Sequence, residues 1–215
     1  MWDLPTRIFH WALAASFAGL LTTALIAGDA MAWHFRFGYT VLCLLLFRVV
    51  WGVIGGHWSR FGSFIYSPGA VLNYVRGQAP PEHSVGHNPL GAMSVFALLL
   101  FLLLQVASGL VSDDEIATAG PLSKFASSAV VRLATVYHTE IGKLIVIALA
   151  SIHVCTILFY RLKRGEDLVA PMIHGDKQTD FVAPCARDDA RTRTLAAAVF
   201  VVCAALVGWM IRQAG

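Results

Sequence analysis

Four histidines lie in or at the ends of long apolar stretches of this 215-residue chain: His10, His34, His138 and His153. An imidazole is costly to place inside a bilayer, so it usually serves as a ligand or a proton carrier there. His138 and His153 share one stretch and lie 15 positions apart, which is about 22 Å along an α-helix. Fifteen steps of about 100° also bring the two side chains to within about 60° of each other around the helix axis. This stretch is therefore expected to present one imidazole to each half of a membrane.

The stretches that must position these histidines are too long and too evenly apolar for β-strands. The chain is 57% hydrophobic and 13% charged, with a mean hydropathy of +0.67, whereas a soluble domain is about a quarter charged. A helix needs roughly 20 apolar residues to cross a bilayer core. The sequence therefore predicts an all-α integral membrane protein. Its five expected transmembrane helices are Ile8–Ala27, Phe37–Ile54, Leu90–Val111, Val136–Tyr160 and Leu195–Ile211.

The distribution of Lys and Arg predicts the orientation of these helices, because cytoplasmic loops carry an excess of both residues. Ten lie on one side of the expected spans and four on the other. The ten-charge side is expected to be the cytoplasm, which places the N-terminus inside and the C-terminus in the periplasm. The ten are Arg7, Arg60, Arg76, Arg161, Lys163, Arg164, Lys177, Arg187, Arg191 and Arg193, and the four are Arg36, Lys124, Arg132 and Arg212.

The depths of the four histidines match in pairs. His34 and His138 fall near the outer ends of two spans, whereas His10 and His153 fall toward the inner ends of two spans. A porphyrin iron takes axial ligands from opposite faces, so two imidazoles from separate helices in each leaflet indicate two b-type haems. The absence of a C-x-x-C-H motif excludes covalently attached haem. The chain also carries no nucleic-acid motif or phosphate loop.

Other residues are candidates for contacts with the haems. Gly38 and Gly142 each follow an outer histidine by four residues, so each is expected to leave room for a porphyrin one turn deeper. Small residues are also common wherever membrane helices pack, which is the alternative. Arg48 is expected either to meet a propionate of the inner haem or to extend to the cytoplasmic surface. His87, in the sequence Gly-His-Asn-Pro, is a second candidate for an inner propionate.

An ordered set of motifs resembles the bacterial cytochrome b561 and nickel–iron-hydrogenase-type cytochrome b family. The matching stretches are residues 2–11 (WDLPTRIFHW), 33–34 (WH), 48–52 (RVVWG), 86–91 (GHNPLG), the helix with His138 and His153, and 168–173 (LVAPMI). The resemblance implies a four-helix di-haem membrane domain over residues 1–177. It assigns the inner haem to the first and fourth helices and the outer haem to the second and fourth. Residues 178–194 are then expected to form a cytoplasmic linker, and residues 195–215 an additional transmembrane helix.

The resemblance also implies a function for the chain. It indicates electron transfer across the bacterial inner membrane, between a quinone pool and a periplasmic c-type cytochrome or redox enzyme subunit. The acidic run Asp113–Glu115 would suit a basic face on such a partner. Two alternatives stay open: a proton or ion transporter that uses histidines as relay groups, and a membrane anchor whose haems are structural.

Overall fold

The computed structural model describes residues 1–80, 85–116, 118–176 and 186–214. Within this part every regular secondary-structure element is a helix, and the one β-type contact is an isolated bridge between Asp113 and Ala119. The predicted all-α class is confirmed. His83, Lys177, Cys185 and much of the expected linker over 178–194 lie outside the described residues.

Five helical stretches in the described residues are long and apolar enough to cross a membrane, as the sequence predicts. One of them runs without a break from Ser128 to Arg164, because one π-helical turn joins its two α-helical parts and a second extends its C-terminal end. The five are α1 (Leu4–Ile26), α2 (Met31–Ile54), α4 (Pro89–Val111), the combined helix, and α8 (Ala190–Ala214). The combined helix consists of α5 (Ser128–Val136), a π turn (Tyr137–Gly142), α6 (Lys143–Phe159) and a second π turn (Tyr160–Arg164).

Local capping sets where the helices begin. Asp3 precedes α1, and its carboxylate accepts a 2.9 Å hydrogen bond from the backbone N–H of Thr6. Asn88 precedes α4 in the same way and accepts a 2.7 Å bond from the N–H of Gly91. Side-chain caps of this kind satisfy N–H groups that a helix leaves unpaired in its first turn. His10 follows the first cap by seven residues, so it lies in the second turn of α1.

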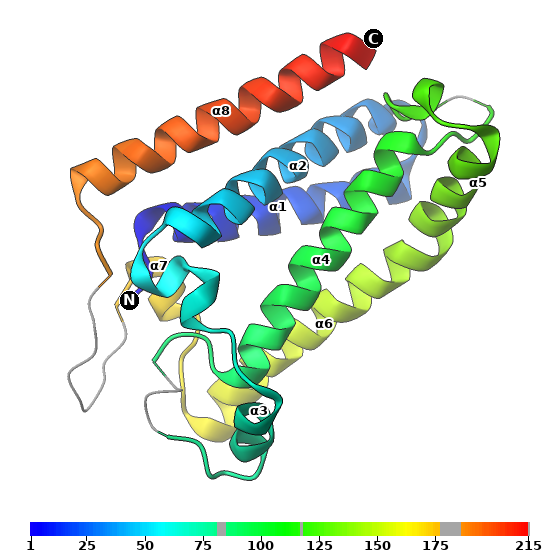
Figure 1. Cartoon of the computed structure of the whole chain (residues 1–215). Coiled ribbons are helices and arrows are strands. Elements are labelled where there is room, and N and C mark those ends of the chain that lie inside the picture. Colours follow the sequence, from blue (N-terminus) through cyan, green and yellow to red (C-terminus); the bar gives the residue numbers. More distant parts are fainter. Residues whose placement is uncertain (81–84, 117, 177–185, 215) are drawn as a thin grey trace.

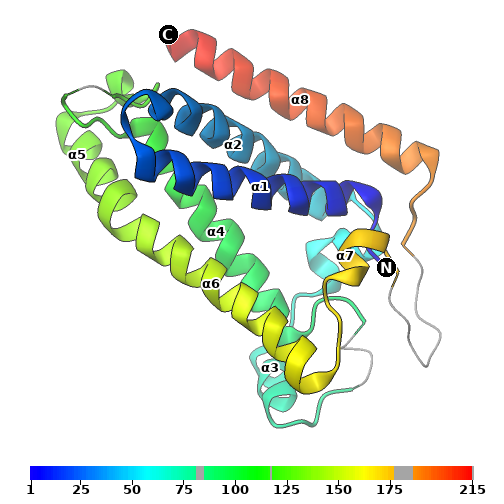
Figure 2. The same cartoon turned by 180° about the vertical axis from the view of Figure 1, so that it is seen from behind.

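The helices form a bundle in which α2 occupies the centre (Figures 1 and 2). Helix α1 lies beside α2. Helices α4 and α6 pack against each other on one side of the bundle, and α8 covers the opposite side of α2. The core that α8 shares with α2 includes Val41, Trp51 and Cys203. Helix α8 begins at Ala190, so the last part of the segment expected as linker is helical.

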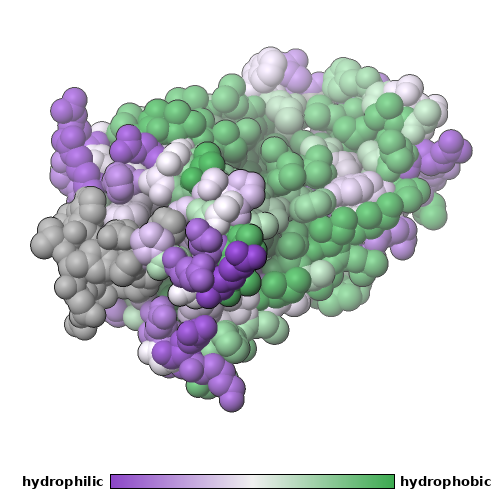
Figure 3. Space-filling view, turned by 60° about the horizontal axis from the view of Figure 1, so that its bottom comes forward, coloured by the Kyte–Doolittle hydropathy of each residue, from purple (hydrophilic) through white to green (hydrophobic). Residues whose placement is uncertain are grey.

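The two ends of the bundle differ in what covers them. The N-terminus, α3 (Pro68–Val75) and α7 (Ala170–His174) lie at one end, and the C-terminus and α5 lie at the other (Figure 1). An apolar surface separates hydrophilic residues at the two ends (Figure 3). The chain is therefore a multi-pass membrane protein.

Candidate haem sites

The structure brings the four membrane histidines together in the two predicted pairs. The ring centroids of His34 and His138 lie 6.3 Å apart, and those of His10 and His153 lie 6.4 Å apart. The outer rings are at 89° to each other and the inner rings at 55°. Both pairs join helices that are distant in the sequence: α2 with the π turn before α6, and α1 with α6.

Both separations fit a metal held between two imidazoles. A metal–imidazole bond of about 2.0 Å, plus about 1.2 Å from ring nitrogen to ring centroid, places two trans imidazoles with centroids roughly 6.4 Å apart. Among the described residues, no three His, Cys, Asp or Glu side chains are grouped to hold a metal ion by themselves. Each pair could therefore supply two ligands to a metal ion whose other ligands come from a group such as a porphyrin.

Hydrogen bonds orient both rings of the outer pair. Nδ1 of His34 lies 3.1 Å from the carbonyl oxygen of Leu20 on α1, and Nδ1 of His138 lies 2.8 Å from that of Gln105 on α4. A carbonyl oxygen can only accept, so each Nδ1 carries the proton and each Nε2 is left as an acceptor. A neighbouring N–H···O bond of this kind fixes the tautomer and raises the basicity of a ligating imidazole.

The side chain of Gln105 makes a second contact with the same histidine. Its Nε2 donates a 2.9 Å hydrogen bond to the carbonyl oxygen of His138. That carbonyl lies in the π turn Tyr137–Gly142, where bonds between residues i and i+5 replace the usual i and i+4 pairing. Sequence reasoning missed Gln105, although an amide within the apolar stretch Leu90–Val111 was a visible signal.

The two glycines expected to admit a porphyrin have different surroundings. Space is open around Gly38, where an added Cβ would meet no atom within 4 Å. At Gly142 an added Cβ would overlap Oε1 of Gln105 and the ring of Tyr137. The missing side chain of Gly142 thus lets α4 approach the π turn closely, and the expected contact of Gly142 with a porphyrin stays a prediction.

Gly109 makes room for the outer ligand and was also missed by sequence reasoning. An added Cβ at Gly109 would lie 2.6 Å from Cε1 and 2.9 Å from Nδ1 of the His138 ring. Only a residue without a side chain leaves enough space for this imidazole against α4.

The inner pair has a different environment. Nδ1 of His10 is buried and has no hydrogen-bond partner among the described residues. The His10 ring meets the indole of Trp11 edge-on at 5.1 Å, and Nε1 of Trp11 donates to the carbonyl oxygen of Met172 on α7. The segment that follows α6 therefore helps to close the inner end of the bundle.

Arg48 lies in a buried polar cluster at the inner end and does not extend to the surface. Arg48 is 2% exposed, and its guanidinium donates a 2.8 Å hydrogen bond to the carbonyl oxygen of Ser59. The hydroxyl of Ser59 donates a 2.7 Å bond to the carboxylate of Asp3, which is fully buried. The guanidinium also lies 4.7 Å from the ring centroid of Phe61. Burial thus excludes the snorkelling alternative and places the guanidinium in one polar cluster with the carboxylate of Asp3.

His87 lies between two aromatic rings near the inner pair. Its ring centroid is 4.6 Å from that of Trp2 and 4.5 Å from that of Phe64. The pKa of His87 is lowered to about 3, mainly by burial and also by charge repulsion from Arg48, His153 and His10. Its Nδ1 is buried without a partner among the described residues. The ring is therefore a neutral imidazole that can donate one hydrogen bond.

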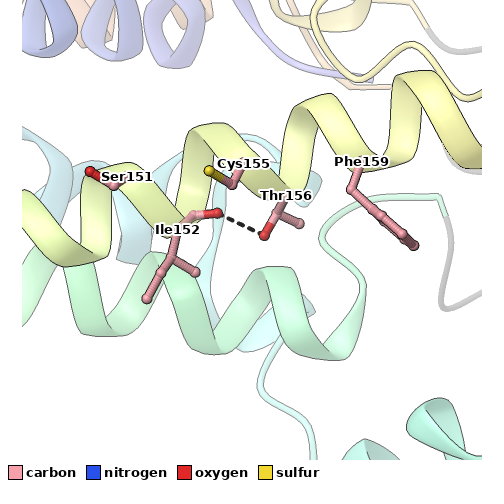
Figure 4. A pocket seen from close by; sticks show the side chains of 5 residues that line it. All are labelled: Ser151, Ile152, Cys155, Thr156 and Phe159. Carbon is pink, nitrogen blue, oxygen red and sulfur yellow. Dashed lines mark hydrogen bonds between the residues drawn. The ribbon is translucent and has the colours of Figure 1, made fainter.

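Two surface grooves of the bundle are not lined by any of the four paired histidines. One lies on α6 and is lined by small and apolar side chains (Figure 4). The Thr156 hydroxyl there donates a 2.8 Å bond to the carbonyl oxygen of Ile152 in the preceding turn. The lining residues are Ser151, Ile152, Cys155, Thr156 and Phe159.

Comparison with known proteins agrees with this geometry. The model of the prokaryotic cytochrome b561 family matches residues 1–175. A probable Ni/Fe-hydrogenase B-type cytochrome subunit from Bradyrhizobium diazoefficiens is 28% identical over 144 residues, covering 54% of this chain and 58% of that protein. A protein of the same description from Cupriavidus necator is 22% identical over 207 residues, covering 81% of this chain and 85% of that protein. Another from Azotobacter vinelandii is 25% identical over 126 residues, covering 46% and 52%.

The match spans little more than half the length of the Bradyrhizobium and Azotobacter proteins. No solved structure matches the chain. The family match covers all four paired histidines and every helix from α1 to α7. This chain belongs to the prokaryotic cytochrome b561 family, whose members are membrane cytochromes that bind b-type haem and carry electrons.

Proposed function

We propose that the chain carries electrons across the membrane through two b-type haems. His34 and His138 hold the outer haem, and His10 and His153 hold the inner one. The observation that carries this proposal is the presence of two imidazole pairs with almost equal separations, at two levels of one bundle. Because His138 and His153 are about 22 Å apart along one helix, the two redox centres share a rigid support.

Each haem iron, when bound, supplies a one-electron couple between the ferric and ferrous states. The residues of the chain determine where this couple lies and what surrounds it. Backbone carbonyls hold the outer imidazoles in the tautomer that leaves Nε2 for the iron. Gly38 leaves space for the outer porphyrin, and at the inner end Arg48 and His87 are placed to meet propionates.

We propose the bacterial inner membrane as the location, with the N-terminus in the cytoplasm and the C-terminus in the periplasm. The excess of Lys and Arg at the N-terminal end supports this orientation. A C-terminal alkaline phosphatase fusion should be active and an N-terminal one inactive. The reverse result would contradict the orientation.

The proposed partners are membrane quinone and a periplasmic redox protein, either a c-type cytochrome or an enzyme subunit. The descriptions of the relatives as hydrogenase cytochrome subunits support the second kind of partner. The acidic run expected to face it forms a tight turn, in which the carboxylate of Asp114 accepts bonds from the N–H groups of Ile116 and Thr118. Replacing Asp113, Asp114 and Glu115 by amides should reduce the salt dependence of electron transfer to the partner. Unchanged salt dependence would exclude this docking role.

The central experiment measures haem content and electron transfer in the same preparation. The purified protein should contain two haems per chain and show a b-type reduced-minus-oxidised spectrum. In sealed liposomes it should pass electrons from external dithionite to entrapped ferricyanide, whereas protein-free liposomes should not. No haem, or one haem per chain, would overturn the proposal, and proton flux without haem would favour the transporter alternative.

A further inference from the structure

We infer that Gln105 is a positioning residue for the outer haem, because its side chain holds the π turn that directs His138. The inference rests on the proposed two-haem function. It assigns a role to a polar residue of α4 that lies inside the membrane and belongs to neither histidine pair.

Gln105 and His138 form a reciprocal pair of hydrogen bonds. The backbone oxygen of Gln105 accepts from Nδ1 of His138 at 2.8 Å, and the side-chain Nε2 of Gln105 donates to the backbone oxygen of His138 at 2.9 Å. The first bond holds the imidazole ring and the second holds the backbone that carries it. One residue of α4 therefore restrains the outer ligand at two points.

The carbonyl oxygen that accepts the second bond lies within the π turn. In an α-helix the N–H of Gly142 would occupy the carbonyl oxygen of His138, because the two residues are four apart. The π turn shifts this pairing by one residue, to the N–H of Lys143. A carbonyl oxygen has two lone pairs, so that of His138 can also accept from Gln105 across the helix interface.

The π turn also improves the alignment of the two ligands on the shared helix. A π turn takes about 4.4 residues, so each residue advances by about 82° rather than about 100°. Over the five steps from His138 to Lys143 the difference is about 90°. The angle between His138 and His153 around the axis then falls from about 60° to roughly 30°, with both directed at the facing helices.

Each of the two helices carries a glycine that makes room for the contact between Gln105 and His138. Gly142 admits the Gln105 side chain, and Gly109, one turn along α4 from Gln105, admits the His138 ring. Oε1 of Gln105 is buried and has no hydrogen-bond partner among the described residues. A polar amide in an apolar helix costs free energy unless its bonds are used, so the bond from Nε2 accounts for its presence.

The test uses Gln105→Leu, which keeps the size of the side chain and removes its donor. The low-spin EPR signal and midpoint potential of the outer haem should shift, and those of the inner haem should not. The two signals are assigned beforehand with His34→Ala, which lacks an outer ligand. Hydrogen exchange of the 137–143 amides in the haem-free protein should rise at least severalfold, which gives a readout independent of haem. Ser94→Ala, on the same helix, is the matched control and should leave all three unchanged.

A double-mutant cycle distinguishes this role of Gly142 from contact with the porphyrin. Gly142→Ala alone should reduce outer-haem occupancy severalfold, because the new methyl group overlaps Gln105. In a Gln105→Ala background the same substitution should cost less than twofold. An equal loss in both backgrounds, or unchanged EPR and exchange in Gln105→Leu, would overturn the inference. A single haem in the wild-type protein would instead overturn the proposed function. Hydrogen exchange in the haem-free protein would then still test whether Gln105 stabilises the π turn.

Discussion

The outer and inner histidine pairs have nearly the same separation but contrasting surroundings. In the outer pair, both Nδ1 atoms bond to backbone carbonyls of neighbouring helices, and no charged side chain is needed to orient them. In the inner pair, Nδ1 of His10 has no partner among the described residues, and a buried arginine lies nearby. The two histidine pairs thus have a similar separation but differ in the hydrogen bonds and charges around them.

This difference has a consequence for redox chemistry. Hydrogen bonds to backbone carbonyls raise the basicity of the outer imidazoles, which favours the ferric state and lowers a haem potential. The guanidinium of Arg48 would favour the ferrous state of the proposed inner haem, and the buried carboxylate of Asp3 in the same cluster would offset part of that effect. If the two proposed haems are bound, the hydrogen bonds of the outer pair would favour electron movement from the outer to the inner site.

The largest expected effect tests whether the two pairs are separate sites. Replacing either His34 or His138 by Ala should remove the outer haem alone, and replacing either His10 or His153 should remove the inner one. Each variant should fall from two haems per chain to one, measured as pyridine haemochrome against protein. Loss of the same haem by His34 and His10 variants would contradict the pairing.

A smaller steric change should affect only the outer site. Gly109→Ala places a methyl group against the His138 ring, and such overpacking typically costs about 1–3 kcal/mol. Outer-haem affinity should therefore fall by a factor of roughly 5 to 150, measured by haem titration of the apoprotein. Gly208→Ala on α8 is the control, because an added Cβ there meets nothing within 4 Å. Equal losses in the two variants would indicate a general effect on folding.

The contrast in hydrogen bonding predicts the order of the two midpoint potentials. Hydrogen bonds worth about 1 kcal/mol each correspond to roughly 40–50 mV in a one-electron couple. The outer haem should therefore titrate roughly 50–100 mV below the inner one in an optical redox titration. Arg48→Gln should narrow the gap by lowering the inner potential. An outer haem with the higher potential would show that hydrogen bonding does not set the difference.

The smallest effect concerns the open space beside Gly38. In an empty space, glycine to alanine within a helix stabilises a protein by about 0.5–1 kcal/mol. If a porphyrin fills this space, Gly38→Ala should stabilise the apoprotein against thermal unfolding but reduce outer-haem affinity severalfold. Stabilisation without any loss of haem affinity would place the porphyrin elsewhere.

Sequence reasoning recovered the fold and the histidine pairs because both depend on local, periodic signals. Membrane spans are long and apolar enough to recognise without tertiary information. The depth of a histidine follows from its position along a span, so His10, His34, His138 and His153 could be grouped by leaflet. Small residues are less informative, because a glycine looks the same whether it faces a cofactor or a neighbouring helix. Gly142, which packs against Gln105 and Tyr137 in the structure, shows this ambiguity.

The sequence by itself determined the five helices, the two levels of histidine and the charge asymmetry of the loops. Only the tertiary structure decided which helix faces surround the ligands. It showed that Gln105 and Gly109 contact His138, that the helix changes to a π turn there, and that Arg48 is buried beside Ser59. These features depend on contacts between helices, and the rotation of one helix against another is set by packing over the whole bundle. The hydrophobic pattern of a single span carries little of that information.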